Sequence, residues 1–392
     1  MGNRKPLFYD VTLRDGNQAL KNPWNFRQKE TIFMQLLKLG VQAIEIGFSG
    51  SSSMDFKACR HLALIAPPGV VVSGLARAKE KDILKVAEAL TGANRKRIHT
   101  FISFSPFHME NVLKKSPEDV RKIAVEAVRF AHSLLGEGQE IQFSVEHFGD
   151  CSENLSFVID SLQEIVAAGA TIINLSNTVE RTRPLIFVEL MKTVFENLPE
   201  GVIPSVHCHN DLGMATATSV ESYFAGATQL ECSLNGLGER AGIANLYEVA
   251  MSLHNCGVEV PLDMSGFYEA ARLLAGMSQI PIPEKSPLIG SDALVHRSSI
   301  HQDGASKTAG MKKGAYRPVD PSLIGRSESE RMGFTSQSGK MAIYEMIRRA
   351  GYAITVEDAV RILPTARKKA EKIGELSLEV LLDLYIQSVK SR

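Results

Sequence analysis

The chain has 392 residues, of which 44% are hydrophobic and 22% charged, a composition typical of a globular protein with a large core. Its 44 basic side chains balance 44 acidic ones and no basic run stands out, so we expect neither a nucleic acid nor a membrane as a partner. No apolar stretch approaches the length of a membrane span. The five cysteines are scattered without a CxxC pair, which indicates free thiols and a cytoplasmic location.

Strand-like and helix-like segments alternate along the first 257 residues, starting with a strand at 7–13 and a helix at 25–39. The other expected strands lie at residues 41–47, 70–75, 97–104, 140–146, 171–175, 203–209 and 229–234. Helices are expected at residues 80–90, 117–135 and 153–168, and after each of the last three strands. Eight such units in roughly 260 residues predict an α/β fold, a closed (β/α)8 TIM barrel, with an open doubly wound sheet as the alternative.

Two features favour the barrel over the open sheet. No Gly-rich dinucleotide loop follows the first strand, and polar residues cluster at the ends of several strands, where barrel enzymes build their sites. Beyond the last strand, a helix at 263–277 precedes a Pro-rich link, a polar stretch with little periodicity from 292 to 324, and amphipathic helices from 337 onward. We therefore expect a catalytic barrel at residues 1–257, a linker with a helix and the Pro-rich segment at 258–290, and a mostly helical C-terminal subdomain at 291–392.

The segment from Val206 to Asp211 carries the first chemical signal. Side chains alternate along a strand, so His207 and His209 point the same way while Cys208 faces the opposite side. Such a pair is as often two satisfied core histidines as a metal clamp. Asp15, which follows the first strand beside Arg14, supplies a third ligand, and the set suits a divalent ion such as Zn, Mn or Mg.

Seven short runs carry a resemblance to a known family. They are LRDGNQAL at 13–20, RIHTFISFSP at 97–106, SVHCHNDLG at 205–213, NGLGERAG at 235–242, SSIHQDG at 298–304, YRPVDPSLIGR at 316–326 and SQSGK at 336–340. Together they resemble the 2-isopropylmalate synthase family, although single pieces also occur in lyases and carboxyltransferases that share the barrel. The family's C-terminal leucine-sensing domain has no counterpart here, so we do not expect feedback inhibition through such a domain.

The resemblance implies a metal-dependent acyltransferase that condenses acetyl-CoA with a 2-oxo acid to a 2-alkylmalate, with release of CoA by thioester hydrolysis. The metal polarises the ketone, and Arg14 stabilises the alkoxide that forms. His301 takes a proton from the acetyl methyl group, with Glu239 expected to tune it, and Tyr316 donates or positions a proton. The segment that carries His301 reaches into the neighbouring subunit's barrel in this family, which implies a homodimer.

The site residues that follow from the motifs and the resemblance fall into three groups. The catalytic group is Arg14, Glu146, His301, Tyr316 and Glu239, the substrate-binding group is Gln18, His99, Ser144, Thr178 and Asn177, and the metal ligands are Asp15, His207 and His209.

Two departures from the family pattern bear on the metal site and the substrate. Ile243 stands where these synthases carry a metal-binding Asn. Homocitrate synthases resemble this chain at that position, but they carry Arg where this chain has Gln142. Ser176 and Asn177 replace the usual Pro-Asp or Pro-Ala. With Phe101, Phe104 and Phe107 nearby, we expect a largely apolar pocket for a neutral 2-oxo acid, 2-oxoisovalerate first. The alternatives are a homocitrate, citramalate or benzylmalate synthase, a lyase or aldolase of this barrel class, and an inactive binding partner.

Overall fold

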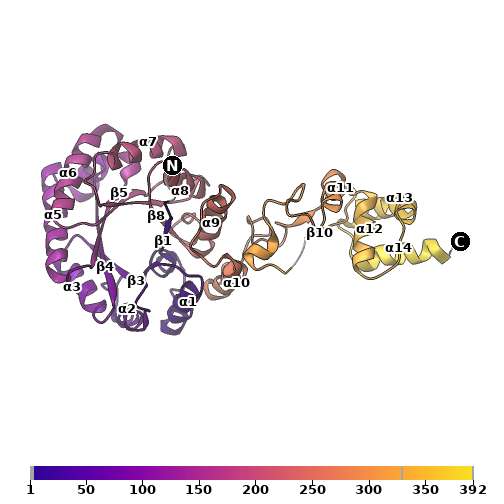
Figure 1. The fold of residues 1–392 in the computed structure, drawn as a ribbon, viewed down its shortest axis with the longest axis horizontal. Coiled ribbons are helices and arrows are strands. Elements are labelled where there is room, and N and C mark those ends of the chain that lie inside the picture. Colours follow the sequence, from indigo (N-terminus) through magenta and orange to yellow (C-terminus); the bar gives the residue numbers. More distant parts are fainter. Residues whose placement is uncertain (1–3, 328–329, 391–392) are drawn as a thin grey trace. The chain divides into compact units, whose positions relative to one another are not determined.

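The computed structural model describes residues 4–327 and 330–390. The chain divides into two compact units, and the boundary between Pro281 and Ile282 falls inside the Pro-rich segment. The first unit holds the elements labelled β1 to α10 and the second holds β9 to α14 (Figure 1). Each unit is described by itself below.

Eight parallel strands form a closed barrel, in which each strand pairs with the next and β8 pairs with β1. Their bounds are β1 Leu7–Asp10, β2 Ala43–Glu45, β3 Val71–Arg77, β4 Arg95–Ser103, β5 Glu140–Glu146, β6 Ile172–Asn177, β7 Ile203–Cys208 and β8 Gln229–Cys232. The predicted (β/α)8 TIM barrel is therefore confirmed, and the open doubly wound sheet is wrong.

Helices surround the strands, as Figure 1 shows for the barrel. They are α1 Phe26–Lys38, α2 Ser53–Ile65, α3 Glu80–Ala89, α5 Pro117–Leu134, α6 Leu155–Ala167, α7 Pro184–Phe195, α8 Ala215–Phe224 and α9 Leu246–Asn255, followed by α10 Phe267–Ser278. Side-chain capping interactions determine where several of these helices begin. Asn25 and Gln28 form a reciprocal capping box at α1, and the Ser116 side chain accepts the Asp119 backbone N–H at α5, whose first residue is Pro117.

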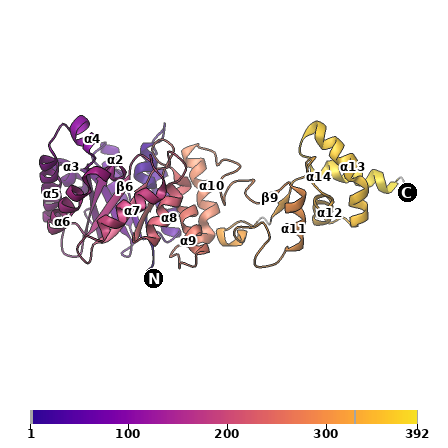
Figure 2. The same cartoon turned by 90° about the horizontal axis from the view of Figure 1, so that it is seen from above.

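Short segments follow some strands at the C-terminal end of the barrel. The short helix α4, Pro106–His108, and the turn η2, Met109–Leu113, come after β4 and stand out at one end of the barrel (Figure 2). The apolar core lies between the strands and the helix layer, where Ile32, Val128 and Leu162 are fully buried.

The first strand is shorter than the predicted 7–13, because the chain turns after Asp10. The Asp10 carboxylate accepts both the Thr12 backbone N–H, at 2.8 Å, and the Thr12 hydroxyl, at 2.9 Å. Such local bonds compete with strand pairing, and residues Thr12–Gly16 form a single π-helical turn, η1. The Thr12 hydroxyl oxygen also accepts the Leu234 backbone N–H at 2.9 Å, which ties the turn to the segment after β8.

The second unit is mostly helical, as predicted. Its elements are β9 Val295–His296, α11 Ser299–Lys307, η7 Pro321–Ile324, β10 Arg331–Met332, α12 Lys340–Arg349, α13 Val356–Ile373 and α14 Leu378–Lys390. The last three helices pack around a core that includes Phe334, Ile343 and Leu381.

Helix α11 lies inside the stretch whose sequence has little periodicity, so no local pattern marks its position. The buried Gln302 amide donates to the carbonyl oxygens of His296 and Gly333 and accepts the Gly339 N–H. These partners lie up to 37 residues away along the chain, so the helix is stabilised by tertiary contacts that no local pattern reports.

Among the described residues, no helix combines the length and the apolar composition needed to cross a membrane.

Burial of Asp10 predicts a pH-dependent stability. Burial raises the pKa of this carboxyl from 3.8 to about 7, although bonds from Thr12 oppose the shift. A carboxyl whose pKa is higher in the folded chain contributes stability below its unfolded pKa, and this contribution is lost as pH rises through the folded pKa. Between pH 4 and 7 the free energy of unfolding of the wild type should therefore fall, relative to Asp10→Asn, by on the order of 3 kcal/mol.

Urea unfolding followed by circular dichroism across this pH range measures the difference. Asp160→Asn, which replaces an exposed carboxyl on α6, is the control and should run parallel to the wild type. A profile for Asp10→Asn that is also parallel to the wild type would contradict the raised pKa.

Candidate active site

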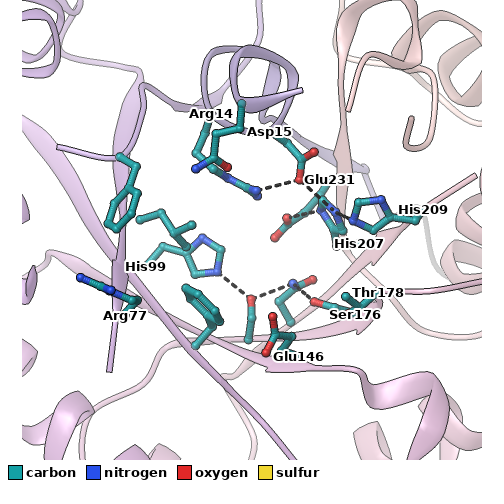
Figure 3. A pocket seen from close by; sticks show the side chains of 16 residues that line it. Arg14, Asp15, Arg77, His99, Glu146, Ser176, Thr178, His207, His209 and Glu231 are labelled. Carbon is teal, nitrogen blue, oxygen red and sulfur yellow. Dashed lines mark hydrogen bonds and ion pairs between the residues drawn. The ribbon is translucent and has the colours of Figure 1, made fainter. Parts of the chain in front are cut away.

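A cavity of about 290 Å³ opens at the C-terminal ends of the barrel strands, where the side chains of several strands converge (Figure 3). Nine of the predicted site residues line it together. They are Arg14, Asp15, Gln18, His99, Ser144, Glu146, Thr178, His207 and His209. Because the carboxyl ends of parallel strands meet at one mouth, residues far apart in the chain gather here.

Asp15, His207 and His209 form a compact group at one side of the cavity. Each offers one ligand atom, and these atoms lie within 4.8 Å of one another. The Nε2 atoms of His207 and His209 are 3.3 Å apart, and His207 Nε2 is 3.7 Å from Asp15 Oδ2. All three residues are buried, so their lone pairs point into a region with little access to water.

The loop after β8 approaches Asp15 closely. The Glu239 backbone N–H donates to Asp15 Oδ1 at 2.9 Å. A Cβ atom on Gly238 would lie 2.9 Å from that same oxygen and 2.8 Å from Ile243 Cγ2, so only glycine fits between them. Ile243 thus adjoins the carboxylate with an apolar side chain that offers no ligand atom.

The positive neighbours of Asp15 keep it ionised. Arg14 Nη1 donates to Asp15 Oδ2 at 2.7 Å. Burial by itself would raise the pKa of Asp15, but Arg14 and the two imidazoles outweigh burial and hold the pKa below its ordinary value. Burial and the neighbouring His207 lower the pKa of His209 to about 3, so its ring is neutral near pH 7 and can coordinate an ion.

Two further carboxyl groups, Glu45 on β2 and Glu231 on β8, belong to this cluster, and neither was predicted to have a catalytic, substrate-binding or metal-binding role. Glu45 accepts from Arg14 Nε at 2.5 Å and contacts His99 Nδ1 at 2.6 Å. Burial alone would raise the pKa of Glu45, but Arg14 and His99 hold it well below its ordinary value. Glu231 Oε2 lies 2.9 Å from His207 Nδ1. Arg14 contacts two of the three buried carboxyl groups and is the guanidinium at this side of the cavity.

This arrangement fits a divalent cation. Two imidazole nitrogens and one carboxylate oxygen converge, and an excess of acidic over basic groups surrounds them. A buried acidic excess is costly unless a cation compensates it. A metal-binding histidine ordinarily has a hydrogen-bond partner at its other ring nitrogen, and Glu231 is in this position for His207.

A polar wall faces the metal ligands across the cavity (Figure 3). His99 Nε2 lies 2.6 Å from the Ser144 hydroxyl, and Asn174 Nδ2 donates to the hydroxyls of Ser144 at 2.8 Å and Ser176 at 3.2 Å. Asn174 was not among the predicted substrate residues, and Ser176 was named only as a departure from the family pattern. The signal that identifies them is alternation, because residues 174, 176 and 178 share the inward face of β6 and the segment after it.

Glu146 and Thr178 lie beside this wall at the ends of β5 and β6. The Thr178 hydroxyl accepts the His147 backbone N–H at 2.7 Å, which ties the two strand ends together. Arg240 donates to the Thr178 carbonyl oxygen at 2.7 Å and also pairs with Asp211. Burial raises the pKa of Glu146, so its protonated form persists to higher pH than in an ordinary Glu.

Two predicted residues of the barrel lie outside the lining. Asn177 is buried, but its Oδ1 faces the opposite side of β6, 2.7 Å from the place that a Cβ on Gly149 would take. Glu239 is exposed, and its contact with the cluster is through its backbone N–H.

Two of the three aromatic residues that were expected beside the pocket lie outside its lining. Phe104 packs between Phe143 and Phe157, and the Phe107 side chain is 68% exposed on α4. The apolar lining consists of Phe48, Leu75 and Phe101. Strand β4 ends at Ser103, so alternation along the strand cannot bring Phe104 or Phe107 into the cavity.

His301 and Tyr316 belong to the second unit and contact each other. Their rings stack with centroids 4.0 Å apart and planes 15° from parallel. A Cβ on Gly304 would lie 2.5 Å from the Tyr316 ring, so the absence of a side chain there lets the tyrosine pack against α11. His301 is exposed, and its neighbour Ile300 is 70% exposed.

Two family descriptions match the chain. Residues 5–274 match HMGL-like proteins, and residues 292–347 match the post-catalytic domain-like region of alpha-isopropylmalate synthase. Among solved structures, the hydroxymethylglutaryl-CoA lyase from Pseudomonas aeruginosa covers 74% of this chain and 96% of its own, with a TM-score of 0.60 and 20% identity. At that identity the likeness shows the barrel fold alone.

Sequence relatives are much more similar. The chain is 56% identical over 376 residues to 2-isopropylmalate synthase 2 of Leptospira interrogans, covering 95% of this chain and 88% of that protein. It is 37% identical over 388 residues to 2-isopropylmalate synthase of Pyrococcus furiosus, covering 97% of this chain and 76% of that protein. The chain therefore belongs to the 2-isopropylmalate synthase family, with an HMGL-like barrel as its first unit.

Proposed function

We propose that the chain condenses acetyl-CoA with a neutral 2-oxo acid, 2-oxoisovalerate first, to give a 2-alkylmalate and CoA. The observation that carries this proposal is the group of Asp15, His207 and His209 beside a small cavity in a chain that is 56% identical to a 2-isopropylmalate synthase. A cavity near the lower end of roughly 300–1,000 Å³ suits a small acid with one reacting end of a larger co-substrate.

Asp15, His207 and His209 would hold the metal, and the mixed set of two imidazoles and one carboxylate favours zinc or manganese over magnesium. When bound, a divalent ion supplies Lewis-acid polarisation of the 2-oxo acid's carbonyl group. Ile243 leaves three protein ligands, so positions remain for substrate oxygens.

Arg14 would stabilise the oxygen that becomes an alkoxide. Its bonds to Asp15 and Glu45 hold the guanidinium at the cavity wall, where it is permanently charged and needs no reorganisation during the reaction. Thr178, whose hydroxyl oxygen already accepts the His147 N–H, would donate its hydroxyl proton to the acid's carboxylate, and Gln18 borders the same opening. Glu146, whose pKa burial raises, would act as a proton donor on this side of the substrate.

His301 and Tyr316 would act on acetyl-CoA. An imidazole can remove the methyl proton, and the stacked tyrosine both limits the orientation of that ring and offers a hydroxyl as proton donor. Exposure of His301 beside the apolar Ile300 supports a role in which this face covers the barrel mouth of a second copy in a homodimer. Such a cover would exclude water until the thioester is ready for hydrolysis.

Arg77 favours a second candidate function, homocitrate synthesis. It lines the cavity, so it offers a cation for a distal carboxylate although Gln142 does not. Arg77 Nε already donates to Asp82 at 2.5 Å, however, and this pairing reduces the charge available to a substrate. We therefore rank a neutral acid first.

Metal content tests the ligand set. The purified wild type should retain about one divalent ion per chain, since three buried ligands bind it and the surrounding carboxylates help to compensate its charge. His209→Ala and Asp15→Asn should lose that ion and the activity with it. His254→Ala, on α9, is the matched control and should keep both. Elemental analysis provides the measurement, and equal metal content in all four proteins would contradict the proposal.

A panel of 2-oxo acids tests the substrate. CoA release should be fastest with 2-oxoisovalerate, with kcat/KM at least about tenfold above that for 2-oxoglutarate, because a second carboxylate meets an already paired cation. Pyruvate and phenylpyruvate test the citramalate and benzylmalate alternatives. A preference for 2-oxoglutarate that Arg77→Ala abolishes would establish the second candidate instead. No CoA release with any acid would favour a lyase or a binding partner.

Mixing two inactive variants tests the shared site. His209→Ala damages the barrel and His301→Ala damages the second unit, so a mixed dimer would contain one site with neither change if the two residues come from different subunits. Randomly reassociated subunits should then recover about a quarter of the wild-type activity. Size-exclusion chromatography confirms the mixing. Recovery close to zero in well-mixed dimers would contradict a site shared between subunits.

A further inference from the structure

A chain of buried polar side chains runs through the barrel interior and ends at His207. Arg97, Gln142 and Glu231 come from β4, β5 and β8, and each is at most 1% exposed. None of the three was predicted as a site residue. Burying polar groups this deeply costs free energy of folding unless they form well-placed hydrogen bonds. Packing alone therefore does not account for their presence here.

The hydrogen bonds in this chain all have a defined direction. Arg97 Nη1 donates to Gln142 Oε1 at 2.9 Å, and Arg97 Nε and Nη2 donate to Glu140 Oε2. Arginine has donors alone, so it fixes the Gln142 oxygen toward itself and turns the amide nitrogen toward the other side. Gln229 Nε2 donates to the same oxygen at 3.0 Å and reinforces this orientation.

The oriented amide then acts on the metal site. Gln142 Nε2 donates to Glu231 Oε1 at 2.6 Å, while Glu231 Oε2 lies 2.9 Å from His207 Nδ1. Because the carboxylate accepts, Nδ1 of His207 donates, and the lone pair of its Nε2 is left to face Asp15 and His209. A flipped Gln142 would instead direct its oxygen at the carboxylate, which the donors on the far side disfavour.

We propose that Arg97 and Gln142 are positioning residues that orient Glu231, and through it fix the coordinating tautomer of His207 and raise the affinity for the divalent ion. Gln142 is thereby assigned to the support of a metal ligand rather than to substrate recognition, in agreement with its absence from the cavity lining among the described residues. The inference rests on the metal site of the proposed function, yet it concerns ion binding and can be tested without acetyl-CoA.

Zinc affinity of the metal-free protein, measured by competition with a chromophoric chelator, is the first test. Glu231→Gln should weaken zinc binding by about 10–100-fold, and Gln142→Met, which keeps the length of the side chain but removes its hydrogen bonds, by about tenfold. Adding Gln142→Met to Glu231→Gln should cost little more, because both changes break the same chain.

Ser205→Ala is the matched control. Ser205 accepts from Gln229 Nε2 at 2.9 Å in the same buried layer, so its loss removes a buried hydrogen bond without touching Glu231. It should change zinc affinity by less than about twofold, since the bonds of Gln142 remain. Equal affinities for Gln142→Met and the wild type, or equal losses for Gln142→Met and Ser205→Ala, would overturn the proposal.

The tautomer of His207 in the metal-free wild type is a second measurement and needs no variant. NMR of the protein with isotope-labelled histidine should show the proton on Nδ1, whereas a proton on Nε2 would overturn the inference. If the wild type bound no zinc or manganese, the proposed function would fail, but the tautomer would still decide this inference separately.

Discussion

Three carboxyl groups buried around a single guanidinium form the constraint on which the site depends. Asp15, Glu45 and Glu231 come from the turn after β1, from β2 and from β8, and Arg14 contacts the first two directly. Such a group has an acidic excess that water cannot screen. A divalent ion between Asp15 and the two histidines would remove the excess, so the same interaction that binds the ion also stabilises the mouth of the barrel.

The backbone around this group is shaped to bring the charges together. A continued strand would send Arg14 and Asp15 to opposite faces, whereas the π-helical turn after Asp10 directs both to the cavity. From the other side, the loop after β8 reaches Asp15 with a backbone N–H, and it can come so close because residue 238 is glycine. The close contact between Arg14 and Asp15 at the cavity thus depends on two local backbone features, the π-helical turn and the glycine at residue 238.

The barrel and the second unit contribute different parts of the proposed chemistry. The barrel, which has the same fold as hydroxymethylglutaryl-CoA lyase, carries the candidate metal ligands and the polar wall. The second unit matches a region described for alpha-isopropylmalate synthase and carries the stacked pair of His301 and Tyr316. In the proposed reaction, the barrel would activate the electrophile and the second unit would supply the base for acetyl-CoA.

The sequence by itself determined the alternation of strands and helices, the pairing of His207 with His209 on one strand face, and the position of Asp15 after the first strand. Those features depend on periods of two and 3.6 residues and on turn residues, all of which are local. Motif order was enough to identify the family.

Only the tertiary structure decided which other groups join them. Glu45 lies 31 residues from Arg14, and Glu231 lies 24 residues from His207, and each pair meets because neighbouring strands of a closed barrel lie in a particular register. The same register turns Ser176 into the cavity and Asn177 away from it, and it leaves Phe104 in the core. Register is set by closure of the whole ring and by packing of every strand against its neighbours, so no single segment of sequence contains it.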